Sequence, residues 1–323
     1  MREALFIKQG TKKWSDFEKN NSTDPDVLAE QFIVITDDLA YAKTFFPKSK
    51  TTVYLNGLAA RFHQSIYKNK KESNKRFAQF WKTELPLLFA QYRKQLMYSF
   101  IFFIVFCLIG IISAKYDNSF LRLVLGDGYV NMTNENIAKG DPFGVYKSFD
   151  SFIMFWMIAK NNITVMVQTF LLGITCSVGT IASLFKNGVM VGSFQYYFIS
   201  KNLGLASVAI WIHGTLEIST IILAGAAGLV LGNSILFPKT YTRFVSLKKG
   251  AKDGMKIALG IIPIVVTAAI FEGFVTRHTE MPLWLSFTIL GSSFLFIIWY
   301  VVIYPIRLSL KLKSDLVKNE GKY

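Results

Sequence analysis

The stretch Trp211–Gly232 reads WIHGTLEISTIILAGAAGLVLG and sets the fold class of the chain. It is apolar except for one histidine, one glutamate and a few hydroxyl residues. At about 1.5 Å per residue it is long enough for a helix to cross roughly 30 Å of hydrocarbon. Small residues recur at every fourth position in its second half, a spacing that lets helix backbones approach closely in lipid. The stretch therefore predicts a membrane-spanning helix that packs tightly against its neighbours.

The composition of the whole chain agrees with a membrane protein. Of 323 residues, 52% are hydrophobic and only 18% are charged, and 29 phenylalanines raise the aromatic share to 15%. A typical soluble domain has about 25% charged residues. The net charge of +15 would suit a nucleic-acid-binding protein, but in a membrane protein lysine and arginine mark the cytoplasmic side and favour anionic lipid. We therefore expect membrane lipid, and no nucleic acid, among its partners.

Six apolar segments after residue 95 are predicted to cross the membrane. The third is short enough to re-enter instead of crossing, and the fourth is long enough to be tilted or broken. The segments cover residues 96–114, 163–184, 187–200, 203–232, 254–275 and 283–305. Residues 1–95 are polar, show helical periodicity and lack the alternation of strands. The predicted fold class is all-α, a polytopic transmembrane bundle with an N-terminal cytoplasmic helical domain.

The charges between these segments predict the orientation. Basic residues predominate at the end of the head, between residues 233 and 253, and in the tail 306–323. By the positive-inside rule all three are expected in the cytoplasm. The loop 115–160 balances its charges and is expected outside, with an interfacial helix at its end. Six crossings satisfy this arrangement only if segment 187–200 crosses, because otherwise the tail would lie outside.

Three ionisable side chains are expected to form an intramembrane polar site. His213 and Glu217 are four residues apart and share a helix face, and Glu272, near the outer end of the fifth span, can reach His213. Such residues are expensive in lipid and suggest function, here a proton or ion relay or part of a metal site. The alternative is a buried hydrogen bond that joins two spans. A metal usually needs three protein ligands, only Glu272 offers a third, and His-Glu-x-x-His is absent, so we predict no catalytic residue, no metal and no cofactor.

Small residues and asparagines are expected to make the remaining contacts. The predicted helix-packing positions are Gly188, Gly192, Gly214, Ala224, Gly225, Gly228 and Gly232. The positions predicted to cap helices or to lie at the membrane interface are Asn161, Asn162 and Asn187. Short glycine-bearing segments also occur at transporter binding sites, which keeps transport open. No phosphate-binding loop or nucleophile elbow occurs, so the chain is predicted not to be an enzyme.

Four segments together resemble the stage II sporulation protein M family of bacterial membrane proteins. They are FFPKSKTTVYLNGLAARFHQSIY in the head, and SFIMFWMIAKNNITV, GITCSVGTIASLFKNGVMVGSF and IHGTLEISTIILAGAAGL in the membrane half. The last is similar to the family's His-Gly-x-x-Glu signature followed by Ala-Gly-Ala-x-Gly. Where the family often has proline before His-Gly, this chain has Ile212. The family pattern falls on Asn162, Asn187, Gly188, Gly192, His213, Gly214, Glu217, Gly225 and Gly228.

The resemblance implies a bacterial cytoplasmic-membrane protein with a structural role. The sporulation member is a scaffold that recruits peptidoglycan-remodelling enzymes, and many relatives accompany MoxR-type ATPases. We therefore predict a non-enzymatic inner-membrane scaffold or component of a cell-envelope complex. Its expected partners are other membrane or envelope proteins, an ATPase-linked cytoplasmic protein bound through the head, or a second copy of the chain. The alternative is a transporter or lipid-handling protein that uses His213, Glu217 and Glu272.

Overall fold

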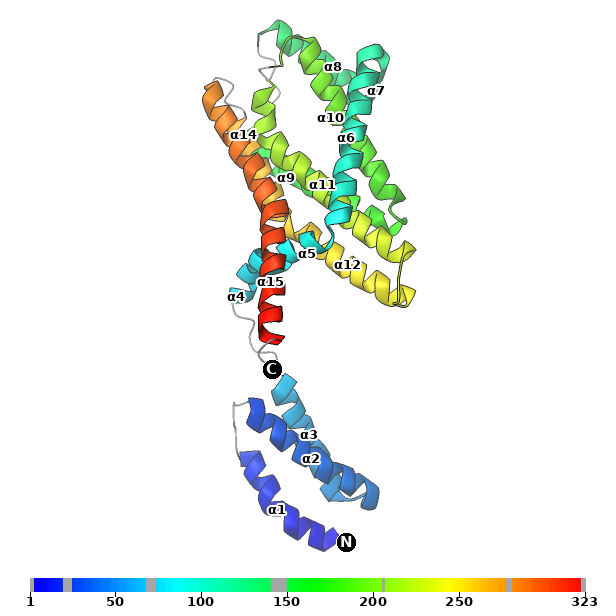
Figure 1. The fold of residues 1–323 in the computed structure, drawn as a ribbon, viewed down its shortest axis with the longest axis vertical. Coiled ribbons are helices and arrows are strands. Elements are labelled where there is room, and N and C mark those ends of the chain that lie inside the picture. The colour runs from blue at the N-terminus through cyan, green and yellow to red at the C-terminus, as the bar shows by residue number, and fades with distance from the viewer. Residues whose placement is uncertain are drawn as a thin grey trace. The chain divides into compact units, whose positions relative to one another are not determined.

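The computed structural model describes residues 3–19, 25–67, 74–140, 150–204, 207–276 and 281–320. In these residues the chain is almost entirely helical and has no β-strand, which confirms the predicted all-α class. The chain divides into two compact units, residues 1–76 and 77–323, called here the head unit and the membrane unit (Figure 1). Residues 141–149 of the predicted outer loop and 321–323 of the predicted tail lie outside the described residues.

The head unit is a small helical domain with its own core. Its helices are α1 (Glu3–Lys19), α2 (Pro25–Phe45) and α3 (Lys50–Tyr67). Their inward faces bury the apolar residues Phe6, Trp14, Ile35, Leu55 and Leu58. The indole Nε1 of Trp14 donates a hydrogen bond of 2.7 Å to Asp38 Oδ2, which joins α1 to α2. Burial of the periodic apolar face therefore holds three short helices together, as helical periodicity predicts.

The membrane unit consists of long α-helices interrupted by short π-helical or 3-10 segments. Its α-helices are α4 (Asn74–Gln79, of which residues 74–76 are assigned to the head unit), α5 (Leu85–Gln91), α6 (Arg93–Tyr116), α7 (Asn118–Leu125), α8 (Asp127–Ala138), α9 (Ser151–Leu171), α10 (Val178–Ser200), α11 (Val208–Leu236), α12 (Arg243–Gly260), α13 (Ile262–Ile270), α14 (Leu283–Ile298) and α15 (Tyr304–Glu320). The π-helical segments are η1 (Phe80–Glu84), η4 (Phe271–Val275) and η5 (Trp299–Ile303), and η3 (Leu172–Ile174) is a 3-10 turn.

The head unit ends earlier than the predicted boundary, because η1 and α5 pack inside the membrane unit. Trp81 Nε1 donates a hydrogen bond of 2.9 Å to the Gly260 carbonyl, and the Tyr300 hydroxyl donates one of 2.8 Å to the Trp81 carbonyl. Phe89 is fully buried in the core that α5 shares with α9, α11 and α12. The charged residues of this segment resemble those of the head, but its apolar face belongs to the membrane helices.

Five helical stretches of the described residues are long and apolar enough to cross a membrane. They are Arg93–Tyr116, Ser151–Ile174, Val208–Leu236, Arg243–Val275 and Leu283–Asp315. The predicted polytopic helical class is therefore confirmed. The fifth predicted span begins earlier than expected, because the basic residues after residue 242 form the first turns of α12. The predicted tail likewise continues the last long helix as α15.

The second and third predicted spans need correction. The predicted interfacial segment and the start of the predicted span 163–184 form one helix, α9, whose N-terminus is capped by Asp150 accepting from the Phe152 amide. The chain turns at residues 172–177, where Cys176 and Ser177 have positive φ angles of 54° and 72°. The turn is closed by a hydrogen bond of 3.1 Å from the Ser177 amide to the Gly173 carbonyl. Hydropathy cannot reveal such a turn, because the residues around it are apolar.

Helix α10 replaces the short segment predicted at 187–200. It has 23 residues and, at about 1.5 Å per residue, is long enough to cross the hydrocarbon. It is not among the five most apolar stretches, because it carries Lys186, Asn187 and Gln195. Its neighbour α6 runs in the same direction, since Phe103 packs near Leu184 at one end and Ala114 near Tyr197 at the other.

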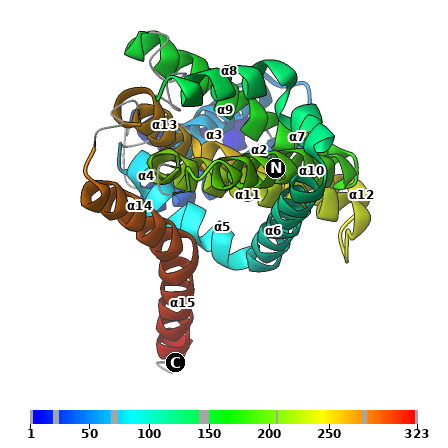
Figure 2. The same ribbon diagram turned by 90° about the horizontal axis from the view of Figure 1, so that it is seen from above.

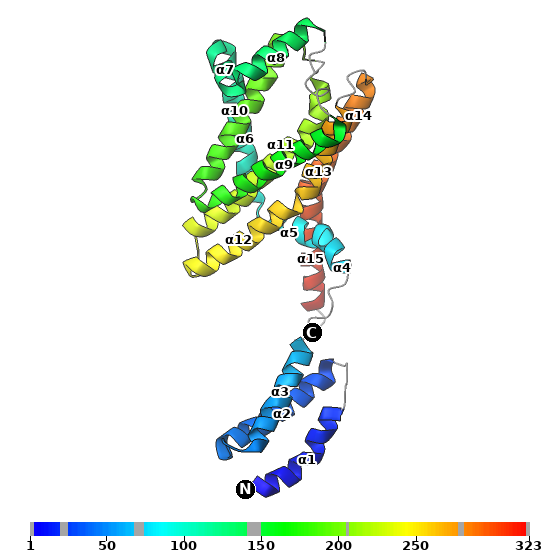
Figure 3. The same ribbon diagram turned by 180° about the vertical axis from the view of Figure 1, so that it is seen from behind.

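Helix α11 lies at the centre of the membrane unit. It contacts α6, α9, α10, α12, α13 and α14, which surround it when the unit is seen from above (Figure 2). Seen from behind, α9 and α11 lie side by side with α12 next to them (Figure 3). Because α11 lies at the centre, 67% of its most apolar stretch is buried, whereas only 17% of the most apolar stretch of α6 is buried. The stretch Trp211–Gly232 therefore lies at the core of the membrane unit.

The small residues in the second half of α11 leave no room for larger side chains. A Cβ added at Gly228 would lie 2.7 Å from the Thr169 carbonyl oxygen, and one at Gly232 would lie 2.9 Å from the Gly173 oxygen. At Gly225 the added atom would lie 2.8 Å from the Leu184 side chain. Ala224 is 0% exposed. These residues let α9, η3 and α10 approach the α11 backbone, as small residues do where lipid gives no hydrophobic drive between helices.

Glycines also bring the backbones of α10 and α6 into close contact. A Cβ at Gly188 would lie 2.8 Å from Phe106 Cβ, and one at Gly192 would lie 2.9 Å from the carbonyl carbon of Cys107. The hydroxyl of Ser193 lies 3.4 Å from the Gly110 carbonyl oxygen in the same interface. The two helices therefore pack backbone to backbone, and this contact positions α10 against the first half of α11.

Candidate functional site

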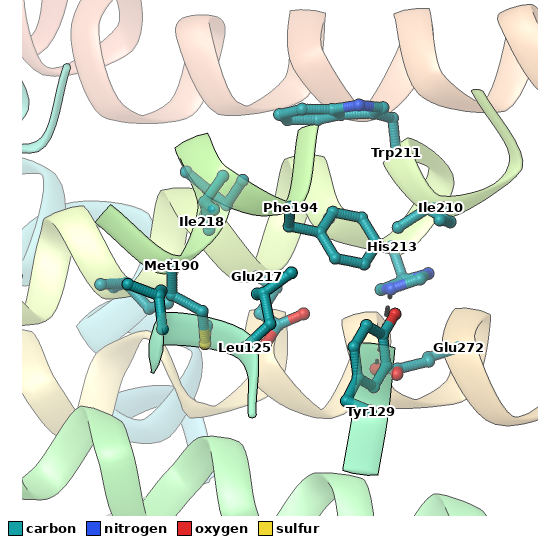
Figure 4. A pocket seen from close by; sticks show the side chains of 14 residues that line it. Leu125, Tyr129, Met190, Phe194, Ile210, Trp211, His213, Glu217, Ile218 and Glu272 are labelled. Carbon is teal, nitrogen blue, oxygen red and sulfur yellow. Dashed lines mark ion pairs between the residues drawn. The ribbon is translucent and has the colours of Figure 1, made fainter. Parts of the chain in front are cut away.

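The three ionisable side chains predicted in the membrane converge in the structure. His213 and Glu217 project from the first half of α11, and Glu272 projects from η4 (Figure 4). His213 Nε2 lies 3.9 Å from Glu272 Oε2, and ligand atoms of all three residues lie within 4.8 Å of one another. His213 is buried, and the two glutamates are partly buried. At about 1.5 Å per residue, His213 lies about 8 Å and Glu217 about 14 Å along α11 from its N-terminal end.

A π-helical turn places Glu272 in this cluster. In η4 the Thr276 amide donates a hydrogen bond of 2.8 Å to the Phe271 carbonyl, five residues earlier. A π turn widens the helix locally, and such turns occur often at functional sites. Here it brings Glu272 and Thr276 to His213 together. Gly273 lets η4 lie close to α9, since a Cβ there would be 3.2 Å from Phe155 Cβ.

The orientation of the imidazole follows from its contact with Thr276. His213 Nδ1 lies 2.9 Å from Thr276 Oγ1, and the same hydroxyl donates to the Phe271 carbonyl at 3.2 Å. A threonine hydroxyl has one proton to donate, so with that proton on Phe271 its oxygen accepts from Nδ1–H. This assignment places the proton on Nδ1 and the lone pair on Nε2, which faces Glu272.

The cluster forms the polar end of a cavity of about 300 Å³. The cavity is bounded by α7, α8, α10, α11 and η4. Apart from the cluster its lining is mainly apolar or aromatic, with contributions from Leu125, Tyr129, Met190, Phe194, Trp211 and Ile218. Burial raises the pKa of Tyr129, on α8, to about 12, so its phenol stays protonated at neutral pH. A ligand in this cavity would therefore meet one polar end and an otherwise apolar wall.

Two hydrogen bonds between helices fix the walls of the cavity. Trp211 Nε1 on α11 donates to Gln195 Oε1 on α10 at 2.8 Å. The Tyr197 hydroxyl on α10 donates to Asn134 Oδ1 on α8 at 2.9 Å. Helices α7 and α8 arise from the predicted outer loop, so that loop contributes a wall to the site. Sequence reasoning missed this wall, because Tyr129 and Leu125 lie in a segment that reads as polar and amphipathic.

The charges of the cluster are unbalanced. Within the described residues no lysine or arginine lines the cavity. Two carboxylates held close together in a medium of low dielectric repel each other strongly, and burying them without a compensating charge is costly. A proton or a metal cation between Glu217, Glu272 and His213 would remove this repulsion. The arrangement can therefore hold a cation or transfer a proton.

Several predicted positions have other surroundings than expected. Asn161 and Asn162 lie in the middle of α9, so they cap no helix end, and Asn187 lies within α10, where its amide donates to the Ser183 carbonyl at 2.8 Å. Gly214, expected at a helix contact, lines the cavity, and a Cβ there would meet nothing nearer than Trp211 at 3.8 Å. The capping expectations failed because α9 already begins at Ser151 and α10 begins at Val178, directly after the turn at residues 172–177. The packing expectation for Gly214 failed because this residue faces the cavity.

The fold and the site together define a polytopic helical membrane protein with a mainly apolar cavity that ends in three ionisable side chains. The family model of Stage II sporulation protein M matches residues 99–277, more than half of the chain, and this range contains all three residues of the cluster. The chain belongs to this family, as the resemblance of its motifs indicated. The head matches a different model, a domain of unknown function (DUF8413), over residues 4–68. No curated protein and no solved structure matches the chain.

Proposed function

We propose that this protein binds a small cation in the intramembrane cavity and passes it across the membrane. The observation that carries the proposal is the convergence of His213, Glu217 and Glu272 on a cavity instead of on a sealed helix contact. A scaffold needs no such group in lipid, where ionisable residues are costly and usually mark ion or proton pathways. The geometry therefore supports transport, which the sequence left open as an alternative, more than it supports a scaffold.

The helix directions support an arrangement with six crossings. Because α10 runs parallel to α6 along its length, a membrane crossed by α6 is crossed by α10 as well. With the five most apolar stretches this makes six, an even number that puts both termini on one side. The basic residues of α12 and α15 favour the cytoplasm for that side. The cavity then opens in the half of the membrane away from the cytoplasm.

Flux into reconstituted vesicles tests the proposal. The purified full-length chain is placed in liposomes that contain either a pH-sensitive dye or a dye quenched by Co²⁺. We expect entry of H⁺ or Co²⁺ above that of empty liposomes, and loss of this entry in Glu217→Gln. The matched control is Glu135→Gln, because Glu135 is an exposed acid on α8 that does not line the cavity. Equal signals from the chain, its Glu217→Gln variant and empty liposomes would refute transport of both ions.

A second candidate function, the non-enzymatic scaffold, is favoured by the head unit. The head has its own core, matches a separate family and exposes apolar side chains, with Val53 72% exposed and Ile33 58% exposed. Exposed apolar side chains in a separate domain are suited to a protein partner. The test is a photo-crosslinking residue at Val53 in the full-length chain in cells. One discrete adduct supports a partner of the head, and a signal equal to that from exposed Lys12 argues against it.

A further inference from the structure

We propose that His213, Glu217 and Glu272 bind one divalent ion of a first-row transition metal. The inference deepens the proposed function, on which it rests for the location of the ligand, because it names the class of cation at the polar end of the cavity. It does not require that the ion be transported. The sequence placed Glu272 within reach of His213 and left part of a metal site as one interpretation, and the structure brings ligand atoms of all three residues within 4.8 Å of one another.

The donor set and its spacing carry the proposal. One imidazole nitrogen and two carboxylates suit Mn²⁺, Fe²⁺, Co²⁺ or Zn²⁺, whereas Mg²⁺ and Ca²⁺ prefer oxygen ligands alone and Cu⁺ prefers sulfur. Metal bonds of about 2.1 Å place neighbouring ligand atoms roughly 3–4 Å apart. The 3.9 Å between His213 Nε2 and Glu272 Oε2 is too long for a hydrogen bond and agrees with a shared ion. Glu217 completes the set within 4.8 Å.

The imidazole is oriented as in metal sites. A histidine that binds a metal through one ring nitrogen usually donates the other N–H to a nearby acceptor, which fixes the tautomer and the ring. Thr276 is that acceptor for His213 Nδ1, and its own proton is held by the Phe271 carbonyl. Phe271 begins the π turn η4 that also carries Glu272, and Thr276 directly follows this turn. The turn therefore supplies one ligand and the support of another.

Charge and space also agree with a bound dication. An ion of charge +2 neutralises two carboxylates, so the loaded site has no net charge in its apolar surroundings. The cavity beside the cluster leaves room for water or another ligand at the remaining coordination positions. Sites with three protein ligands and an open position are typical of metals that act on, or exchange, a ligand.

Titration with Co²⁺ tests the proposal on the purified full-length chain in detergent. Visible absorption reports the coordination of the ion, and elemental analysis gives its stoichiometry. We expect one Co²⁺ per chain and displacement by Zn²⁺. Thr276→Val should weaken binding about 10-fold, the usual effect of losing the partner of a ligating histidine, and Thr276→Ser should restore it. Glu217→Gln and Glu272→Gln should weaken binding more than Thr276→Val does.

The exposed Glu135→Gln variant is the matched control and should bind like the unmodified chain. Absence of a Co²⁺ spectrum from a monodisperse unmodified chain overturns the proposal, and so does equal binding by that chain and Glu272→Gln. The Thr276 pair keeps the test decisive if a glutamate variant does not fold. Metal binding without flux would keep this inference and refute transport. Flux without metal binding would refute this inference and keep transport.

Discussion

The two halves of α11 differ in how closely the neighbouring helices pack against them. In the half after residue 223, Gly225, Gly228 and Gly232 bring neighbouring backbones into contact and leave no space. In the half before it, His213 and Glu217 face a cavity that is bounded by α7, α8, α10 and η4. The comparison shows that close packing is local: it occurs in the half of α11 that has the small residues and not in the half that has the ionisable residues. We call the half after residue 223 the sealed half and the half before it the open half. The close packing of the sealed half holds the open half in place.

The largest effect is expected from a large side chain in the sealed half. Gly228→Leu would drive its side chain into Thr180 and the Thr169 carbonyl, both of which belong to packed helices. Overpacking of this kind costs about 3 kcal/mol in the free energy of unfolding. We expect loss of monodisperse protein in detergent, measured by size-exclusion chromatography with thermal unfolding. A variant as stable as the unmodified chain would show that the sealed half is not closely packed.

Removal of one carboxylate from the open half should have a smaller effect of opposite sign. Glu272→Gln relieves the repulsion with Glu217 and keeps the shape of the side chain. In the presence of a chelator and at alkaline pH, where neither a metal ion nor a proton relieves the repulsion, we expect the variant to be more stable by about 1–2 kcal/mol, since an uncompensated buried charge is costly. Unfolding temperatures with and without added Co²⁺ provide the measurement. A loss of stability in chelator would mean that Glu272 has a structural partner and is not held for an ion.

A single hydrogen bond between two helices that pack on the sealed half of α11 should contribute about 1 kcal/mol. The Thr180 hydroxyl donates to the Thr169 carbonyl at 2.9 Å between α10 and α9, and polar contacts between membrane helices have contributions of this size. Thr180→Val removes the donor with little change in volume, and Thr180→Ser keeps it. We expect only the valine variant to unfold at a lower temperature. Equal losses in both variants would assign the effect to the methyl group.

The smallest effect is expected at Gly214. A Cβ there meets only Trp211, at 3.8 Å, so Gly214→Ala should fit without any shift. Alanine also favours the helix by about 0.5–1 kcal/mol over glycine, and the variant should be as stable as the unmodified chain or slightly more so. Thermal unfolding beside Gly225→Ala gives the contrast directly. A large loss at Gly214 would break the distinction between the two halves.

The sequence revealed the parts of the site that lie on one helix better than the parts that come from several. The spacing of His213 and Glu217 and the small residues after them are regular patterns of a single helix, so they could be predicted. The contact with Glu272 was expected as geometrically possible, but its support by Thr276 depends on a π turn, which has no periodic signal. The span predicted at 163–184 runs through the turn at residues 172–177, because no charge or proline interrupts the apolar sequence there. The cavity is bounded by side chains from five elements, so no single segment of the sequence predicts it.

Thiol accessibility tests the distinction between the open and sealed halves most directly. Cysteine is placed at Gly214 or at Ala224 in a full-length chain whose Cys107 and Cys176 are replaced by serine, and a small charged thiol reagent is added to membranes. We predict that Gly214→Cys reacts, that Co²⁺ slows its reaction, and that Ala224→Cys stays unreacted. Equal reaction at the two positions, or no reaction at Gly214 under any condition, would contradict an ion-accessible site in this half of α11.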